Sequence, residues 1–488
     1  MSTVTQPIEL DVISPAVPLP TLTRPSTVGS IGLEEGGVKA DDGDTDRLRG
    51  LNTAQGEGEG TQELPPVDRG RGAWGFVVAA FFLETFIWGY SYSFASVLVW
   101  LQHNKPWSDN SVSTLSAIGS IQLGVQFLLP LPTILAFRRY PEYVKLVLWV
   151  CVVLNCGSML ISSFANKVWQ LIILQGVIAG ASGSVLYTPV LIWLNDWFVL
   201  RKGLASGIIF GGAGIGGFAF PFLLSALLNK TGFAWTLRIW SFLTLTVFSV
   251  SVYLIKPRVP PPKRINQGER GPWLAVDPKV LLNPILIAMC FASLFCSLAT
   301  FPASLYLATY AASLTPSTFT AEIVVGVYNL AASLGCAITG WLSDRNWPLA
   351  ATLCGAFSSI CALSAWGLAD SLSKVFGFAV VAGFTSQIIA AWGSCATDVA
   401  SNGSPYTATL AFGVLSIVRG AASVAMPFVA EGLYRPDAKG ADAKRFGRFG
   451  FEMMIIFIGI MGFLAALAGV AIALIRRKMV KEGKLRKQ

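Results

Sequence analysis

Residues 204–228 read LASGIIFGGAGIGGFAFPFLLSALL, a continuous run without a single charged side chain. A helix rises about 1.5 Å per residue, so about 20 apolar residues cross the roughly 30 Å hydrocarbon core of a bilayer. A core helix of a soluble protein would show a polar face every third or fourth residue, and this run does not. The apolar stretches at 146–164 and 451–475 also meet this length. The chain is therefore predicted to be a polytopic membrane protein.

The same alternation of apolar stretches and short polar breaks repeats from Trp74 onward. Twelve membrane-spanning helices are expected, at 74–101, 112–137, 146–165, 168–197, 204–228, 235–255, 283–309, 321–343, 348–369, 374–398, 407–430 and 451–475. The longest break within this region is basic and proline-rich, and it divides the spans six and six. We therefore expect two six-helix bundles, 71–255 and 283–476, joined by a cytoplasmic linker at 256–282.

Charge is distributed unevenly along the chain. Only 13% of residues are charged, against about 25% in a typical soluble protein. Residues 1–68 hold 12 acidic and 4 basic side chains, whereas the rest holds 15 acidic and 32 basic ones. The bases lie at helix ends and form no single patch, which argues against a nucleic-acid partner. Residues 1–70 are predicted to be a disordered, acidic tail because they have few apolar side chains to bury.

The positive charges also predict the orientation. With both termini in the cytoplasm, 21 basic residues lie on the cytoplasmic side and nine lie outside. The tail at 477–488 is then basic and cytoplasmic. In this topology Asn229, in the sequon at 229–231, is the external candidate for glycosylation. We expect a multi-pass protein of the plasma membrane, with the lipid bilayer as its surroundings.

Several functional classes lack their required residues. The eight cysteines lie in apolar stretches without metal-ligand or redox spacing, and His103 is the only histidine. No Walker motif or nucleophile elbow is present. We therefore expect no enzyme, no catalytic residue, no metal site, no cofactor and no ATP-driven transport.

Three stretches carry a resemblance to a known family. They are RGAWGFVV at 71–78, GVIAGASGSVLYTP at 176–189 followed by RKGLASG at 201–207, and GWLSDR at 340–345. Over roughly 70–476 the chain resembles the monocarboxylate porter-like branch of the major facilitator superfamily, especially its fungal members. The resemblance implies an all-α membrane protein with twelve transmembrane helices in two six-helix bundles. It also implies a monomeric transporter of a small organic substrate.

The chain departs from that branch where lactate-type chemistry resides. Pro132 and Ala136 stand where the first-half loop motif of the superfamily has Gly and Asp. Ser96 corresponds to the lysine that proton-coupled monocarboxylate carriers place in the first helix. Their Asp and Arg of the eighth helix have no counterpart in 323–342, where Asn329 is the strongest polar group.

Two charged residues lie near the middle of predicted spans. Glu84 lies about 15 Å along the first helix from Trp74. A charge at that depth costs roughly 2.5–3.5 kcal/mol on insertion scales, so it should face the bundle interior. Trp88 and Tyr92 share its face. Arg419, about halfway across the eleventh helix, has a guanidinium suited to recognising an anion. For both charges, the alternative is a structural role in holding helices together.

Other residues complete the predicted pathway and gate. Asn329, and Trp392 inside the tenth helix, are expected to join Glu84, Trp88, Tyr92 and Arg419 along a substrate or proton pathway. A conformational gate is expected from the loop-motif residues Arg201, Lys202, Gly340, Asp344 and Arg345. Glycines at four-residue spacing, such as Gly203, Gly207 and Gly211, are expected to let helix backbones approach closely.

These observations favour a secondary transporter that works by alternating access. By analogy with fungal members of the branch, we expect an efflux carrier for a secondary metabolite larger or more aromatic than lactate. A proton-coupled importer of monocarboxylates is the first alternative. A transporter-like nutrient sensor that signals through its acidic tail is the second.

Overall fold

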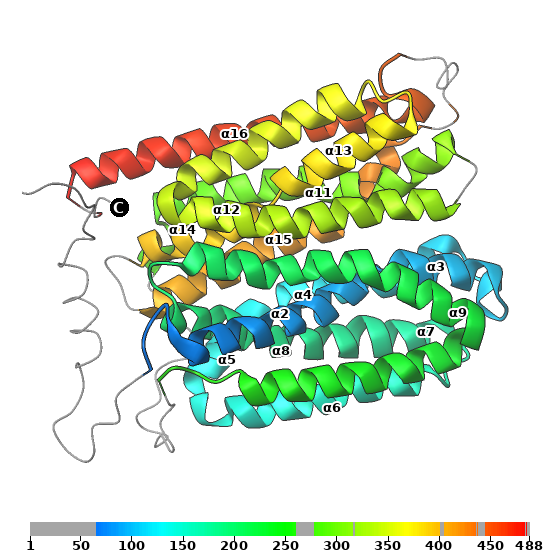
Figure 1. Cartoon of the computed structure of the whole chain (residues 1–488), viewed down its shortest axis with the longest axis horizontal. Helices are drawn as coiled ribbons and strands as arrows, with labels where there is room; N and C mark the ends of the chain where they lie inside the picture. The colour runs from blue at the N-terminus through cyan, green and yellow to red at the C-terminus, as the bar shows by residue number, and fades with distance from the viewer. Residues whose placement is uncertain are drawn as a thin grey trace, which may run out of the picture. The chain divides into compact units, whose positions relative to one another are not determined.

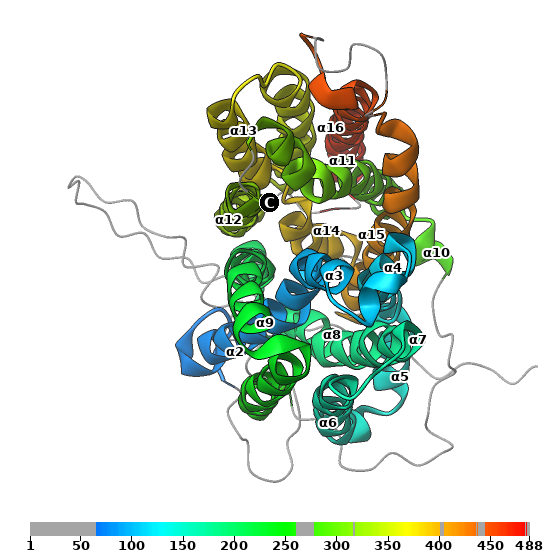
Figure 2. The same ribbon diagram turned by 90° about the vertical axis from the view of Figure 1, so that its right-hand side faces the viewer.

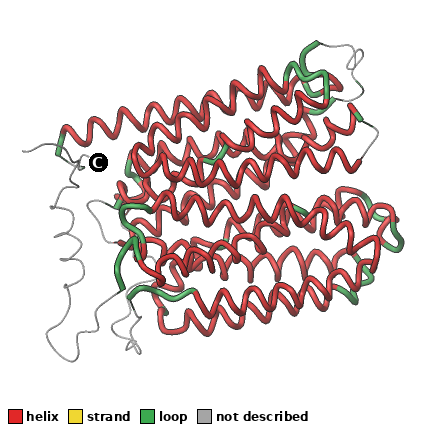
Figure 3. Tube along the Cα trace, in the orientation of Figure 1, coloured by secondary structure: helices red, strands yellow, loops and turns green. Residues whose placement is uncertain are grey.

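The computed structural model describes residues 65–259, 278–315, 318–400, 405–435, 437, 445–483 and 485. Within these residues the chain is helical, and no strand is present in them (Figure 3). The predicted disordered tail up to residue 64 lies outside the described residues, as do residues 260–277 of the predicted linker and residues 484 and 486–488 of the basic tail.

The first four spans are each built from one or two helical pieces. They are α2 (Gly70–Tyr92) with α3 (Phe94–His103), α4 (Val112–Leu128) with α5 (Pro130–Arg139), α6 (Val144–Ser162), and α7 (Val168–Leu171) with α8 (Gly180–Trp197). The second span bends by 40° between its two pieces. Pro130 opens α5 at this bend and has no N–H to continue the hydrogen-bond ladder. A π-helical stretch, Ile172–Ala179, joins α7 to α8.

Two longer helices each contain a reversal. The helix α9 (Lys202–Leu254) has 53 residues, which would measure about 80 Å if straight, far more than a bilayer needs. It turns back at Gly232, whose φ of 73° lies in the left-handed region that glycine adopts most readily. The helix α12 (Thr318–Ile360) is broken in the same way at Asn346. Figure 1 shows α9 running across the molecule and returning beside α6.

The remaining helices complete the second half. They are α10 (Pro278–Leu281), α11 (Pro284–Leu314), α13 (Leu372–Thr385), α14 (Trp392–Val399), α15 (Pro405–Leu433) and α16 (Glu452–Lys481). The side chain of Asn283 caps α11 by accepting a 2.9 Å hydrogen bond from the Ile285 amide. The helix α16 continues beyond residue 476, where the sequence analysis ended the second bundle.

The helices agree with the predicted number of spans. In the described ranges, nine helices are long and apolar enough to cross a membrane, and the bent pair α4–α5 makes a tenth. Two of the nine, α9 and the run from α12 into the π-helical turn Cys361–Trp366, each contain a reversal and count twice. Twelve spans result, and both reversals fall in the breaks that the sequence predicted. The prediction of an all-α membrane protein is confirmed.

The two halves meet along long helix pairs (Figure 2). The helix α9 packs against α2 within its own half and against α12 of the other half, and α4 and α5 pack against α15. A Cβ on Gly212 would lie 2.6 Å from the Phe81 carbonyl oxygen of α2, and one on Gly211 would lie 3.0 Å from the Ser333 carbonyl oxygen of α12. The small residues therefore permit close backbone approach, as the sequence spacing predicted.

Candidate functional site

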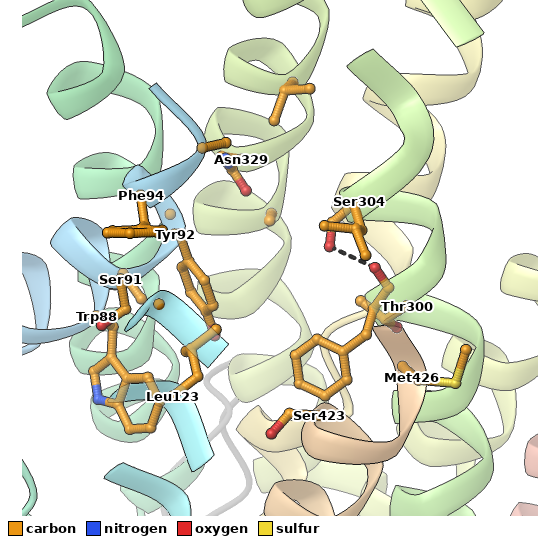
Figure 4. Close-up of a pocket in the computed structure, with 18 of the residues that line it drawn as sticks. Trp88, Ser91, Tyr92, Phe94, Leu123, Thr300, Ser304, Asn329, Ser423 and Met426 are labelled. Carbon is orange, nitrogen blue, oxygen red and sulfur yellow. Dashed lines mark hydrogen bonds between the residues drawn. The ribbon is translucent and has the colours of Figure 1, made fainter. Parts of the chain in front are cut away.

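A central cavity of about 300 Å³ lies between the halves. It is lined by α2, α3, α4, α8 and α9 of the first half and by α11, α12, α15 and the turn before α14 of the second. In Figure 4, Trp88, Tyr92 and Leu123 face Thr300 and Met426 across it. Its walls are mainly aromatic and aliphatic, with a few polar groups converging on them, as in typical small-molecule sites.

Glu84 lines this cavity from the middle of α2 and is only 3% exposed. The indole of Trp88, one turn further on, faces the Glu84 carboxyl group. The geometry falls short of a hydrogen bond, so Glu84 Oε2 and Trp88 Nε1 are both buried without one. The Trp88 ring packs 4.3 Å from the Phe127 ring and edge-on to Tyr187. A rigid aromatic wall thus holds a buried acid whose hydrogen-bonding capacity is not used up.

Arg419 enters the same cavity from α15 and is 7% exposed. Its Nη1 donates a 3.3 Å hydrogen bond to Ser297 Oγ, whereas its Nε has no hydrogen-bond partner. Its Cζ lies 5.1 Å from the ring centroid of Phe301 and 5.9 Å from that of Phe127. Because Phe127 belongs to the first half and Phe301 to the second, the guanidinium is held between rings from both halves.

The two opposite charges share the cavity, and the described contacts contain no ion pair between Glu84 and Arg419. Tyr92 lies within electrostatic range of both. Each charge thus keeps polar atoms available to a third group. An organic solute with an anionic group, a hydrogen-bonding group and an apolar body would match these walls.

The other predicted pathway residues divide between the cavity and its surroundings. Asn329 lines the cavity, and its Nδ2 also donates a 3.1 Å hydrogen bond to the Gly217 carbonyl oxygen across the halves. Gln387, in the turn before α14, also lines the cavity. Trp392 does not: it is 1% exposed, and its ring lies 6.5 Å edge-on from the Phe412 ring in the core.

The cavity is closed at one end by contacts between the halves, and we call this the closed end. The Asp344 carboxylate of α12 accepts hydrogen bonds from the amides of Gly203 (2.6 Å) and Leu204 (2.8 Å) at the start of α9. Lys202 Nζ donates a 2.9 Å hydrogen bond to Thr397 Oγ1. Gly340 packs so closely on Gly203 that a Cβ would overlap the Gly203 carbonyl oxygen. Toward the opposite end, the lining extends to Leu98, Ser116, Ala308 and Val325.

Not every loop-motif residue contacts the other half. The Arg345 guanidinium lies 3.9 Å over the ring of Trp341 on its own helix. Arg201 is exposed, and its backbone amide is bonded to Asp68. Asn229 is exposed beside the reversal of α9, away from the closed end.

Asp68 is a site residue that the sequence analysis did not single out. It is 5% exposed, and its carboxylate accepts hydrogen bonds of 2.9–3.2 Å from the amides of Val199, Leu200 and Arg201. Its own amide donates to the Trp197 carbonyl oxygen. The loop between α8 and α9 is therefore held by Asp68, and the start of α9 is held by Asp344 from the other half. An acid next to the RGAWG motif was the only sequence signal.

Replacing Asp68 with asparagine should lower the thermal stability of the purified protein. Its φ of 58° is one that asparagine tolerates well, so the change isolates the carboxylate. We expect a loss of about 1–2 kcal/mol, because charge-assisted bonds to backbone amides are replaced by weaker ones. Asp109→Asn, at an exposed residue of a short 3₁₀ turn, is the matched control and should change little. Equal melting temperatures for the two variants would contradict this role.

The described residues contain no cluster of histidine, cysteine, aspartate and glutamate side chains able to hold a metal ion. All eight cysteines are free thiols in the structure.

Comparisons with known proteins agree with this architecture. The family model for the Major Facilitator Superfamily matches residues 73–427. The chain is 28% identical over 280 residues to "MFS-type transporter 1" of Ophiocordyceps sp. (strain BCC 1869), a match that covers 57% of this chain and 60% of that protein. It is 26% identical over 325 residues to the "Fujikurins efflux protein" of Gibberella fujikuroi, covering 66% of this chain and 68% of the relative.

A solved structure shows the same fold. The human organic anion transporter MFSD10 (TETRAN) superposes with a TM-score of 0.58 at 14% sequence identity, covering 82% of this chain and 99% of that one.

Proposed function

Because the chain belongs to the major facilitator superfamily, we propose that it exports a small organic metabolite by alternating access. The main support is the central cavity, which is lined by both halves and contains Glu84 and Arg419. Contacts between the halves seal it at the closed end. Such a cavity exposes its solute to one side at a time when the halves rock. A relative named as an efflux protein supports the direction. We further propose that a single chain suffices, because its own two halves together enclose the cavity.

The proposed solute is an amphiphilic organic acid with an aromatic or extended apolar body. Trp88, Tyr92, Phe127 and Phe301 supply the apolar walls, and Arg419 supplies the cation. The monocarboxylate branch remains part of the proposal at the level of resemblance, since its fungal members carry the motif at 176–207. Proton exchange through Glu84 is the proposed source of energy.

Transport in a host cell tests the direction. We expect cells that express the protein to accumulate less of a fluorescent amphiphilic carboxylate than cells that express the Arg419→Ala variant. Inside-out plasma-membrane vesicles should take up the same probe when the vesicle lumen is made more acidic than the surrounding medium. Uphill uptake by intact cells, with none by inside-out vesicles, would identify an importer and overturn the proposed export.

The proposed orientation places the closed end and both termini in the cytosol of a plasma-membrane protein. The basic residues concentrated at that end favour it. A protease-sensitive tag added after Gln488 should therefore be fully protected in intact cells and cut after permeabilisation. Cleavage of the tag in intact cells would refute this orientation.

A further inference from the structure

A second cavity, of about 610 Å³, lies at the closed end and shares no lining residue with the central cavity. It forms where helices begin or end, namely at the last turn of α5, the first turn of α6, the last turn of α8, the segment after α9 and the first turns of α15. The first three belong to the first half, the segment after α9 is the start of the predicted linker, and α15 belongs to the second half. The central cavity and the gate do not account for it.

Its lining is apolar in the middle and charged around it. Phe137, Val144, Ile192, Trp193 and Val259 provide the apolar surface. Three bases, Arg138, Lys145 and Lys256, and two acids, Glu142 and Asp196, provide the charge, so the bases exceed the acids by one. Apolar walls next to an excess of cations suit a ligand with an apolar body and an anionic group.

The basic side chains of this cavity differ in their contacts with the rest of the protein. Lys145 Nζ donates hydrogen bonds to the carbonyl oxygens of Val252 (2.7 Å) and Ile255 and so holds the end of α9. Lys256 is exposed, and its ammonium lies 5.2 Å from the Tyr253 ring. Replacing Lys256 therefore removes charge from the cavity and leaves the contacts between the halves in place.

Two contacts join the halves across this cavity. The Arg138 guanidinium lies 3.8 Å from the Tyr406 ring centroid, and Asn195 Nδ2 donates a 3.4 Å hydrogen bond to Thr409 Oγ1. Asn195 Oδ1 and the Tyr406 hydroxyl are buried there without hydrogen bonds. Buried polar atoms without partners are costly, so a ligand that supplies a donor and an acceptor binds favourably.

We propose that this cavity is a regulatory site for an amphiphilic anion, which binds when the two halves are joined at the closed end. A ligand that touches Tyr406 and Thr409 of one half and Arg138 and Asn195 of the other binds the closed form better than the open form. By linkage, it shifts the population toward the closed form and slows opening. The anion is supplied either by the headgroup of an acidic phospholipid or by a soluble amphiphilic phosphate.

Binding can be measured without transport, so the test is independent of the proposed export. The full chain in phosphatidylcholine nanodiscs is titrated with dodecyl phosphate. Lys256→Gln should weaken binding about fivefold, the typical effect of one cation near an anionic headgroup. Ile192→Phe should weaken binding by filling the apolar part. Lys230→Gln, which removes the same charge beside the reversal of α9, should bind like the wild type.

Hydrogen exchange at the amides of Gly203 and Leu204 reports opening, because Asp344 of the other half holds both amides. Dodecyl phosphate should slow their exchange in the wild type and less so in Lys256→Gln. Slower exchange in nanodiscs doped with phosphatidylserine, without added ligand, identifies the lipid as the source. Slowing by dodecyl phosphate alone identifies a soluble anion.

Three results would overturn the proposal. The first is wild-type binding by both Lys256→Gln and Ile192→Phe. The second is equally tight binding of uncharged dodecanol, and the third is binding that leaves the exchange of the two amides unchanged.

Discussion

Replacing Glu84 with glutamine is expected to leave the protein folded in the membrane and to make transport independent of pH. Glutamine keeps the shape and the hydrogen-bonding capacity of the side chain, so the contact surface with Trp88 is retained. It cannot gain or lose a proton, so any exchange of a proton for the solute through this residue ends. Initial rates in vesicles across a pH series, normalised to protein level, measure the effect.

Arg419→Lys is the companion variant on the other side of the cavity. It keeps the charge but loses the planar fork that stacks between Phe127 and Phe301. We expect the apparent affinity for an anionic solute to fall about tenfold, a difference of about 1.4 kcal/mol. Arg238→Lys is a matched control, because Arg238 is also within a span and stacks on aromatic rings but does not line the cavity.

The alternative hypothesis is that Glu84 and Arg419 form an ion pair whose role is to hold the helices together. Each neutral variant would then lower the amount of protein at the surface, because it leaves the other charge buried alone. The charge-swapped double variant would restore that amount. The absence of a direct ion pair between them in the described contacts favours the transport role. Unchanged flux and an unchanged pH profile in both single variants, at normal surface levels, would rule out that role.

Gly340→Val is expected to reduce transport at least about tenfold by preventing the closed end from forming. Its side chain would occupy the position of the Gly203 carbonyl oxygen, so α9 and α12 would have to separate. Overpacking of a tight contact typically costs about 1–3 kcal/mol, enough to depopulate a marginally favoured state. The amides of Gly203 and Leu204 should then exchange hydrogen faster, because they lose their bonds to Asp344.

Gly377→Val is the control for this substitution. Gly377 lies in α13, and a Cβ there meets nothing within 4 Å. Both changes place valine in a helix, so the propensity cost is shared and only the contact differs. Similar transport by the two variants would show that the glycine contact does not determine closure.

The arrangement of spans follows from sequence physics with few additional assumptions. Uninterrupted apolar runs decide where the chain crosses the bilayer, and Gly232 and Asn346 mark reversals that lie within predicted breaks. The inward orientation of Glu84 and Arg419 could also be predicted from the sequence, because a charge in an apolar run must face the protein interior. These predictions depend on local composition, which a single sequence displays.

The residues that contact Glu84 and Arg419 cannot be predicted from local composition. Phe127 and Phe301 are two of many phenylalanines, and only the packing of α15 against α4 and α11 brings both to Arg419. Trp392 has the same local signature as a pathway residue, yet its helix turns it into the core. Asp68 lies outside the apolar runs altogether. Contacts between segments far apart in the chain determine these roles. Hydrophobic periodicity alone does not predict such contacts.

The hydrogen bond from Asn329 to Gly217 bears on how an empty carrier behaves. The same amide lines the cavity, so a bound solute competes for the group that ties the two halves together near their middle. Under the proposed alternating-access mechanism, an unloaded protein would keep this hydrogen bond and rock slowly, whereas a loaded one would exchange it for a contact with the solute. If protons are exchanged for the solute as proposed, this hydrogen bond would suppress cycling without a solute, and Asn329→Ala should raise the leak of protons in solute-free vesicles.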